Sequence, residues 1–158
     1  MRIYLPATAR DLTADEITPR RAHAATASLA QALQDEDEEG LEVSASLCAA
    51  DSSVLLLAEV ADSGDGPRPR RVVVAADVEP GTVTEVAPGG DVLPGTVEVT
   101  VPVSWEDVAA LLVDEPEAEA DVHAAAQGDE QAFERAADAD LLWFDVSERA
   151  CLAADLNR

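Results

Sequence analysis

The apolar residues of this chain fall in short runs, separated by polar, proline-rich and glycine-rich stretches. The clearest run is 72–76 (VVVAA), whose unbroken apolar character predicts a central strand covered on both faces. Residues 2–5 (RIYL) and 141–144 (LLWF) predict two further short strands. Residues 96–103 alternate valine with polar side chains, which indicates a strand with one face in water.

A long helix is predicted from about Asp37 to Ala61. Acidic residues at its start favour this helix because they complement the helix dipole and the free N–H groups of the first turn. The apolar side chains expected to face the sheet are Leu47, Val54, Leu55, Leu57 and Val60. The helix is followed by residues 63–69 (SGDGPRP), whose glycines and prolines predict a loop.

The remaining patterns predict helices at 28–33, 117–127, 129–137 and 147–156, an edge strand at 82–86 and a buried strand at 110–113. Residues 20–26 (RRAHAAT) fit either a helix or a strand. Strands that alternate with helices are typical of a layered α/β domain. We therefore expect residues 1–158 to form a single α/β domain, with a mixed sheet of about five strands and helices packed on it.

Several segments resemble an uncharacterised family of small acidic actinobacterial cytoplasmic proteins. They are the opening MRIYLPAT, RRAHAAT with the following DEDEEGLE, RRVVVAADV, and LLWFDVSE near the end. The family has no assigned activity, so the resemblance implies a compact cytoplasmic protein and no reaction. It also favours a strand at 20–26. The chain departs from its relatives at Val43 and Phe144, where they tend to carry tyrosine.

The charge of the chain limits its partners. The formal net charge is -23, all ten cations are arginine, and residues 72–134 hold fifteen acids and no lysine or arginine. Such a surface repels phosphate backbones and anionic membranes, so we expect no direct nucleic-acid binding and no membrane binding. A basic protein surface is the expected partner. The same composition is also typical of a protein from a GC-rich host that is kept soluble by its acids.

Several chemistries are excluded by the residues that the chain lacks. A Walker A phosphate loop and a Schiff base both need lysine, and the chain has none. No G-x-S-x-G nucleophile motif occurs, and the two histidines, His23 and His123, lack metal-ligand spacing. We expect no cofactor and no metal. Because no run approaches the roughly 18 apolar residues of a membrane span and no leader pattern opens the chain, a cytoplasmic location is expected.

Three aspartates follow predicted strands and are the candidate catalytic residues. Asp77 follows VVVAA, Asp114 follows ALLV and Asp145 follows LLWF. If these strands are parallel neighbours, the three carboxylates converge at one edge of the sheet, where open α/β sheets bind ligands. They would then line the pocket of a small enzyme, with or without a metal ion. The alternative is that each aspartate is a turn or cap residue.

Two charged groups are candidate binding residues. The acidic run is Asp35, Glu36, Asp37, Glu38 and Glu39. It matches the first half of a calcium-binding EF-hand loop, but Ser46 stands where the bidentate glutamate is required, so a solvated helix cap is favoured. Arg70 and Arg71 are either structural ion-pair anchors, which we favour, or part of an interface.

The leading functional hypothesis is a non-enzymatic binding or regulatory protein that engages a basic protein surface. In this interpretation the acidic segments 35–42 and 114–121 steer the encounter. The first alternative is the small enzyme with a carboxylate-lined pocket, and the second is a nucleic-acid mimic whose carboxylates copy phosphate spacing.

Overall fold

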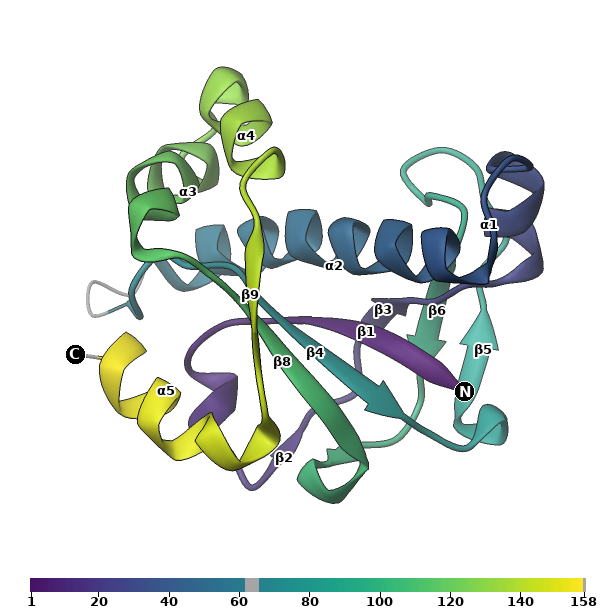
Figure 1. Cartoon of the computed structure of the whole chain (residues 1–158), viewed down its shortest axis with the longest axis horizontal. Helices are drawn as coiled ribbons and strands as arrows, with labels where there is room; N and C mark the ends of the chain where they lie inside the picture. Colours follow the sequence, from purple (N-terminus) through teal and green to yellow (C-terminus); the bar gives the residue numbers. More distant parts are fainter. Residues whose placement is uncertain (62–65, 158) are drawn as a thin grey trace.

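A computed structural model of the chain describes residues 1–61 and 66–157, so the predicted loop at 63–69 lies partly outside the described residues. The fold is α/β, with a seven-stranded sheet in the order β5-β6-β3-β1-β4-β8-β9 and a two-stranded sheet of β2 and β7 (Figure 1). The strands are β1 (Arg2–Ala7), β2 (Glu16–Ile17), β3 (Arg21–His23), β4 (Val72–Asp77), β5 (Val83–Glu85), β6 (Thr96–Val99), β7 (Val103–Ser104), β8 (Val108–Asp114) and β9 (Leu141–Phe144). The helices are α1 (Ala27–Ala32), α2 (Glu38–Ala61), α3 (Glu119–Ala126), α4 (Glu130–Ala137) and α5 (Arg149–Leu156).

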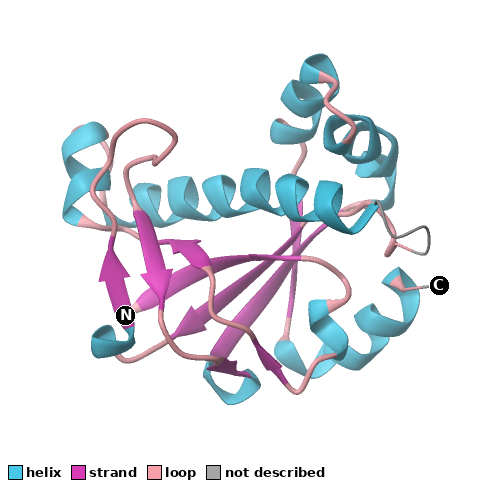
Figure 2. Ribbon diagram, turned by 180° about the vertical axis from the view of Figure 1, so that it is seen from behind, coloured by secondary structure: helices cyan, strands magenta, loops and turns pink. Residues whose placement is uncertain are grey.

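The large sheet has a helical layer on each face (Figure 2). The long helix α2 crosses one face, where its alanines and Leu41 pack against Tyr4, Val73 and Ala75. On the other face, α5 packs against the remaining side chains of the same central strands. The short helices α3 and α4 pack on each other and on α2. The β4 side chains from Val72 to Ala76 are buried, as their unbroken apolar run predicts.

The prediction of a mixed sheet of about five strands was imprecise. The pairings that build both sheets are antiparallel, and the large sheet has seven strands. Strands β2, β3, β5 and β7 have only two or three residues. A segment this short carries too few alternating positions for its pattern to stand out. Strand direction is set by the connections between strands, which local patterns do not reveal.

The helix α2 begins at Glu38, one residue after the predicted start, and its sheet-facing side differs from the expected one. Leu41, Ala45 and Ala49 are buried at spacings of four residues. Leu47 and Leu55 were expected to face the sheet, but they are 44% and 64% exposed. Small alanine side chains let the helix approach the sheet closely, and the larger leucines are turned outward.

The length and mean hydropathy of α2 would allow it to cross a membrane, and among the described helices it alone meets both criteria. Asp51, Glu59 and several serines interrupt the apolar residues of α2, so no unbroken apolar run in the sequence indicated a span. The core helix of a folded domain meets the same criteria. Here α2 packs on the sheet along much of its length.

Candidate functional site

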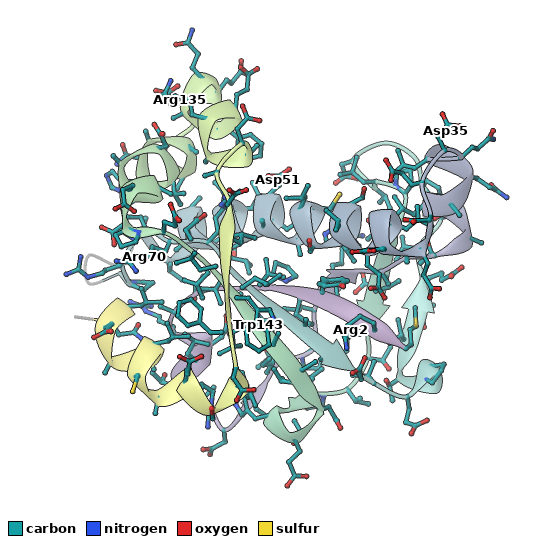
Figure 3. All side chains as sticks on the ribbon, viewed as in Figure 1. Arg2, Asp35, Asp51, Arg70, Arg135 and Trp143 are labelled. Carbon is teal, nitrogen blue, oxygen red and sulfur yellow. The ribbon has the colours of Figure 1, made fainter. Side chains whose placement is uncertain are left out.

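The helix α2 leaves part of its face of the sheet uncovered. Its main strand contacts are with β1, β3 and β4, whereas β8 and the edge strand β9 reach the same apolar cluster through Ala110, Leu112 and Leu141. Trp143 of β9 points to this open side and is 64% exposed, and its place in front of the central strands is visible in Figure 3. Isolated exposed apolar residues are ordinary, but a large aromatic beside an uncovered sheet face marks a candidate binding surface.

Two adjoining cavities follow this open side, with volumes of about 420 Å³ and about 290 Å³. Both are lined by Ser46 of α2 and Leu112 of β8, so they adjoin, and we treat them together as one groove. We call it the α2–β9 groove and define it by Val43, Ser46 and Leu47 on α2, Leu112 on β8, and Leu141 and Trp143 on β9. Its centre is apolar, as in most ligand-binding surfaces.

Carboxylates flank the α2–β9 groove at both ends. Glu39 and Glu42 line one end, and Asp138 and Asp140 line the other. None of the four forms an ion pair with a residue in the described part of the chain. The groove therefore combines an apolar centre with acidic ends that have no cation of their own.

Among residues 1–61 and 66–157, the one cation that lines the groove is Arg2, and its charge is already neutralised. Its Nε lies 2.7 Å from Oδ1 of Asp77, and its second bond to that carboxylate is 3.0 Å long. The Arg2 guanidinium lowers the pKa of Asp77, and the carboxylate in turn raises the pKa of Arg2. Asp77, the last residue of β4, is thus the ion-pair partner of Arg2 on β1.

The three candidate aspartates, which would converge if their strands were parallel neighbours, do not share one edge of the sheet. β4 and β8 are antiparallel, so Asp77 and Asp114 lie at opposite ends of the sheet. Asp145 follows β9 at the Asp77 end, two strands away. Hydrogen bonding by the side chain and by the backbone N–H of Ser147 lowers the pKa of Asp145, which also forms a capping box with Glu148. The assumption of parallel strands was wrong, and Asp145 is the cap residue of the alternative interpretation.

Asp114 forms a buried ion pair with Arg71. Both side chains are almost fully inaccessible to solvent, and the Arg71 guanidinium donates to Asp114 at 2.7 to 3.1 Å. The backbone N–H of Arg71 donates to the same carboxylate at 2.7 Å, and the guanidinium also donates to the carbonyl of Ala139. This pair joins the start of β4 to the end of β8. Arg71 is therefore a structural anchor, and neither residue can reach a partner surface.

The other predicted binding residues lie on the surface or in local contacts. Residues 35–39 are all exposed. The carboxylate of Asp37 accepts from the backbone N–H of Gly40 at 2.9 Å, which confirms the helix-cap interpretation. Arg70 donates to Glu119 at 2.8 Å as a half-buried ion pair. Across residues 1–61 and 66–157, no group of three or more His, Cys, Asp or Glu side chains is arranged to hold a metal ion.

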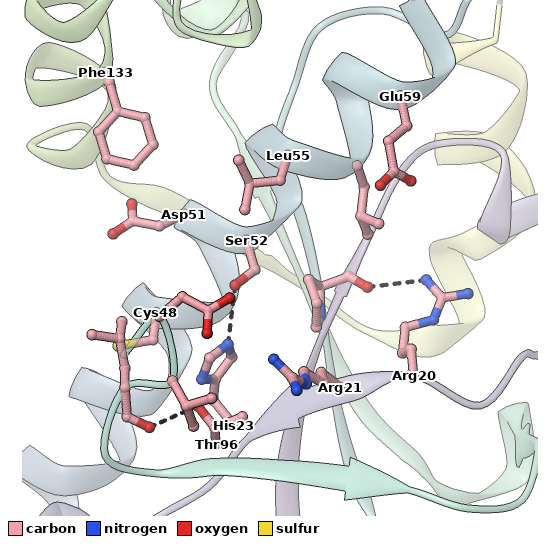
Figure 4. A pocket seen from close by; sticks show the side chains of 15 residues that line it. Arg20, Arg21, His23, Cys48, Asp51, Ser52, Leu55, Glu59, Thr96 and Phe133 are labelled. Carbon is pink, nitrogen blue, oxygen red and sulfur yellow. Dashed lines mark hydrogen bonds between the residues drawn. The ribbon is translucent and has the colours of Figure 1, made fainter. Parts of the chain in front are cut away.

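Apart from the two cavities of the groove, a separate cavity lies on the β3–β6 side of α2. His23 of β3 lines it and is 6% exposed. Its Nε2 lies 3.1 Å from the hydroxyl of Ser52, and its buried Nδ1 has no partner among the described atoms (Figure 4). Ser52 lies in the middle of α2, where the backbone N–H groups are used by helix bonds and cannot form an oxyanion hole. The pair is a polar wall of the cavity, and Nδ1 of His23 lacks, among the described residues, the carboxylate partner that orients the histidine of a Ser-His-Asp triad.

His23 is expected to stay neutral well into acidic pH. Burial lowers its pKa from 6.5 to about 4. Between these two values the unfolded chain binds a proton that the folded chain does not, so His23 reduces stability as the pH falls through this window. A titration of the His23 ring by NMR should give a midpoint near pH 4. A midpoint near 6.5 would show that the ring is solvated.

Sequence reasoning missed the residues that form the α2–β9 groove and those that form the separate cavity beside His23. LLWF was correctly predicted as a strand, but nothing in it shows that the strand lies at an edge and leaves Trp143 exposed. Val43 and Leu47 are separated by four residues, which places them on one side of a helix. That spacing was the one available signal for the groove wall. His23 and Ser52 come from separate elements, and no local pattern connects them.

The fold and the groove define an α/β protein whose largely antiparallel sheet has an open, acid-flanked apolar side. By its sequence the chain belongs to a family of unknown function, DUF6912, whose profile matches residues 1–153. Comparison with curated proteins found no match, and comparison with solved structures found none either. The family membership agrees with the resemblance of the opening, central and closing segments.

Proposed function

We propose that the protein is a non-enzymatic binding protein that captures a basic, amphipathic segment of a partner protein in the α2–β9 groove. The observation that carries the proposal is the exposed Trp143 in an apolar groove whose ends are flanked by unpaired carboxylates. Tryptophan is among the residues that contribute most to protein interfaces. A partner segment with apolar residues at its centre and lysine or arginine at its ends would match both features of the groove.

The charge distribution supports a basic partner over an acidic one. Arg2, the one arginine of the described chain that lines the groove, is bound to Asp77, so the described residues offer no free cation there to an acidic partner. The acidic run 35–39 lies just before the groove residue Val43 and extends the negative surface. Complementary charge of this kind raises the association rate and selects among partners, while the apolar contact sets the lifetime of the complex.

A carboxylate-dependent enzyme has less support. Asp114, one of its three candidate residues, is enclosed with Arg71, and antiparallel pairing separates it from Asp77. The nucleic-acid mimic stays a prediction, since the groove geometry does not bear on it. We extend the proposal to a cytoplasmic location in an actinobacterium, and this part rests on the sequence resemblance.

The proposal is tested with a short helical peptide of leucine and lysine and a matched peptide in which glutamate replaces lysine. Calorimetry should show binding of the lysine peptide, with an affinity that falls about tenfold or more from low to high salt because the charges are exposed. The glutamate peptide should not bind. Binding of both peptides with similar affinity would contradict the proposal.

A matched pair of double variants separates the groove from the general negative charge of the protein. Glu39→Gln with Glu42→Gln removes two carboxylates at the groove, and Glu106→Gln with Asp107→Asn removes two exposed carboxylates elsewhere. The groove variant should weaken binding of the lysine peptide several-fold more than the second variant. Equal effects would show that the peptide responds only to net charge.

A further inference from the structure

The cavity on the β3–β6 side of α2 is large enough for a small molecule and has a mainly apolar lining. Its volume is about 620 Å³, within the usual range for ligand pockets. The apolar walls come from α2, the 91–93 loop and α4, and include Leu55, Leu56, Leu93 and Phe133. Leu55 and Leu93 are 64% and 55% exposed. These side chains have apolar surface that a ligand could cover.

The two arginines at this cavity are neutralised by their own partners. Arg20 donates to both carboxylate oxygens of Asp11, at 2.9 and 3.1 Å, and to the carbonyl of Pro6 at 3.0 Å. Arg21 donates to Glu98 at 2.8 Å. The charge of each arginine is therefore offset by a carboxylate of the chain before any ligand binds.

The carboxylates of the cavity, unlike its arginines, are not held in ion pairs within the described part of the chain. Asp51, Glu59 and Asp91 line it, and none of them forms an ion pair or a side-chain hydrogen bond with a residue that the structure describes. Asp51 is half-buried, and this burial raises its pKa, since its charge is poorly solvated. The charge of Arg71 acts in the opposite direction, but Arg71 is held by Asp114. Asp51 and Glu59 thus place negative charge without an ion-pair partner beside an apolar wall, whereas the charge of Asp91 is partly offset by the nearby Arg21.

We propose that this cavity binds a small organic ammonium ion with an apolar body. The ammonium group would sit between the Asp51 carboxylate and the Phe133 ring, which Figure 4 shows on the same side of the cavity. A cation is attracted both to a carboxylate and to the face of an aromatic ring. Leu55, Leu56 and Leu93 would cover the apolar body. His23, neutral at physiological pH, adds no repelling charge.

The test uses 2-phenylethylamine as the probe, with the neutral 2-phenylethanol and the anionic 3-phenylpropionate as comparators. Each is titrated into isotopically labelled protein and followed through the backbone NMR signals of α2, α4 and the 91–93 loop. The amine should bind about tenfold more tightly than the alcohol, as expected for a charge-assisted hydrogen bond. The carboxylate should not bind. Tighter binding of the carboxylate, or amine-induced shifts confined to other regions, would overturn the proposal.

One variant and two controls identify the carboxylate that carries the binding. Asp51→Asn should weaken amine binding about tenfold, while Glu106→Gln, an exposed carboxylate elsewhere, should leave it unchanged. Trp143→Ala should also leave it unchanged, because Trp143 lies outside this cavity. Unaltered amine affinity in Asp51→Asn would show that this carboxylate does not hold the ammonium group. The proposal is independent of the peptide groove, since the two sites lie on different sides of α2.

Discussion

Replacing Asp114 with asparagine should lower the free energy of unfolding by about 3–5 kcal/mol. The change leaves the positive charge of Arg71 buried without its counter-charge, which is the costly outcome for a buried ion pair. It also weakens the contact between the start of β4 and the end of β8, where the backbone N–H of Arg71 donates to the same carboxylate. For a domain whose total stability is about 5–15 kcal/mol, the loss is a large part of the whole. Urea denaturation followed by circular dichroism measures it.

The control for this prediction removes both charges together. The double variant Arg71→Met with Asp114→Leu should lose much less stability than Asp114→Asn, because no unpaired charge remains in the core. Asp107→Asn, which neutralises an exposed aspartate, should change stability by about 0.5 kcal/mol at most. A loss below about 1 kcal/mol in Asp114→Asn would mean that water reaches the pair and that its burial has little energetic weight.

Replacing Trp143 with alanine should weaken binding of the leucine–lysine peptide by about thirtyfold or more, which corresponds to about 2 kcal/mol. Trp143 provides the largest apolar surface in the α2–β9 groove, and its 64% exposure leaves that surface free to be buried by a partner. The same exposure means that the folded protein depends little on the side chain. We therefore expect its stability to change by about 1 kcal/mol or less. Calorimetric titration and urea denaturation give the two values.

Leu142→Ala is the matched control for Trp143. Leu142 precedes it in β9, is 38% exposed and points to the opposite face because side chains alternate along a strand. Its removal should leave peptide binding unchanged within about twofold, an energy difference of about 0.4 kcal/mol. If Leu142→Ala weakened binding as much as Trp143→Ala, the loss would reflect damage to the edge strand, and the groove would not be the binding surface.

The local sequence pattern was sufficient for the longer elements. VVVAA forms β4 and is buried, LLWF forms β9, and the acidic start of α2 caps the helix as expected. Each of these signals is contained in adjacent residues. The short strands, such as β2 with two residues, gave no comparable signal. The side of α2 that faces the sheet was also predicted wrongly, because leucines lie on several sides of the helix. The small alanine side chains, not the leucines, determine how closely the helix approaches the sheet.

The functional residues could be predicted only in part, because their positions depend on strand order and direction. Asp77 and Asp114 would meet only if their strands were parallel, and antiparallel pairing places them at opposite ends of the sheet. Arg71 and Asp114 are far apart in the sequence, and their pairing follows from the neighbouring positions of β4 and β8. The exposure of Trp143 follows from the position of β9 at the edge. Each of these facts becomes available only when the whole sheet is known.

The central claim is that the α2–β9 groove binds a basic amphipathic segment, and the most direct measurement is to locate that segment on the protein. Titration of the leucine–lysine peptide into isotopically labelled protein, followed by backbone NMR shifts, shows which residues respond. We predict the largest shifts at Val43, Leu47, Leu112, Leu141 and Trp143, together with burial of the Trp143 indole. Shifts centred on other surfaces, or spread evenly over the exposed carboxylates, would contradict the claim.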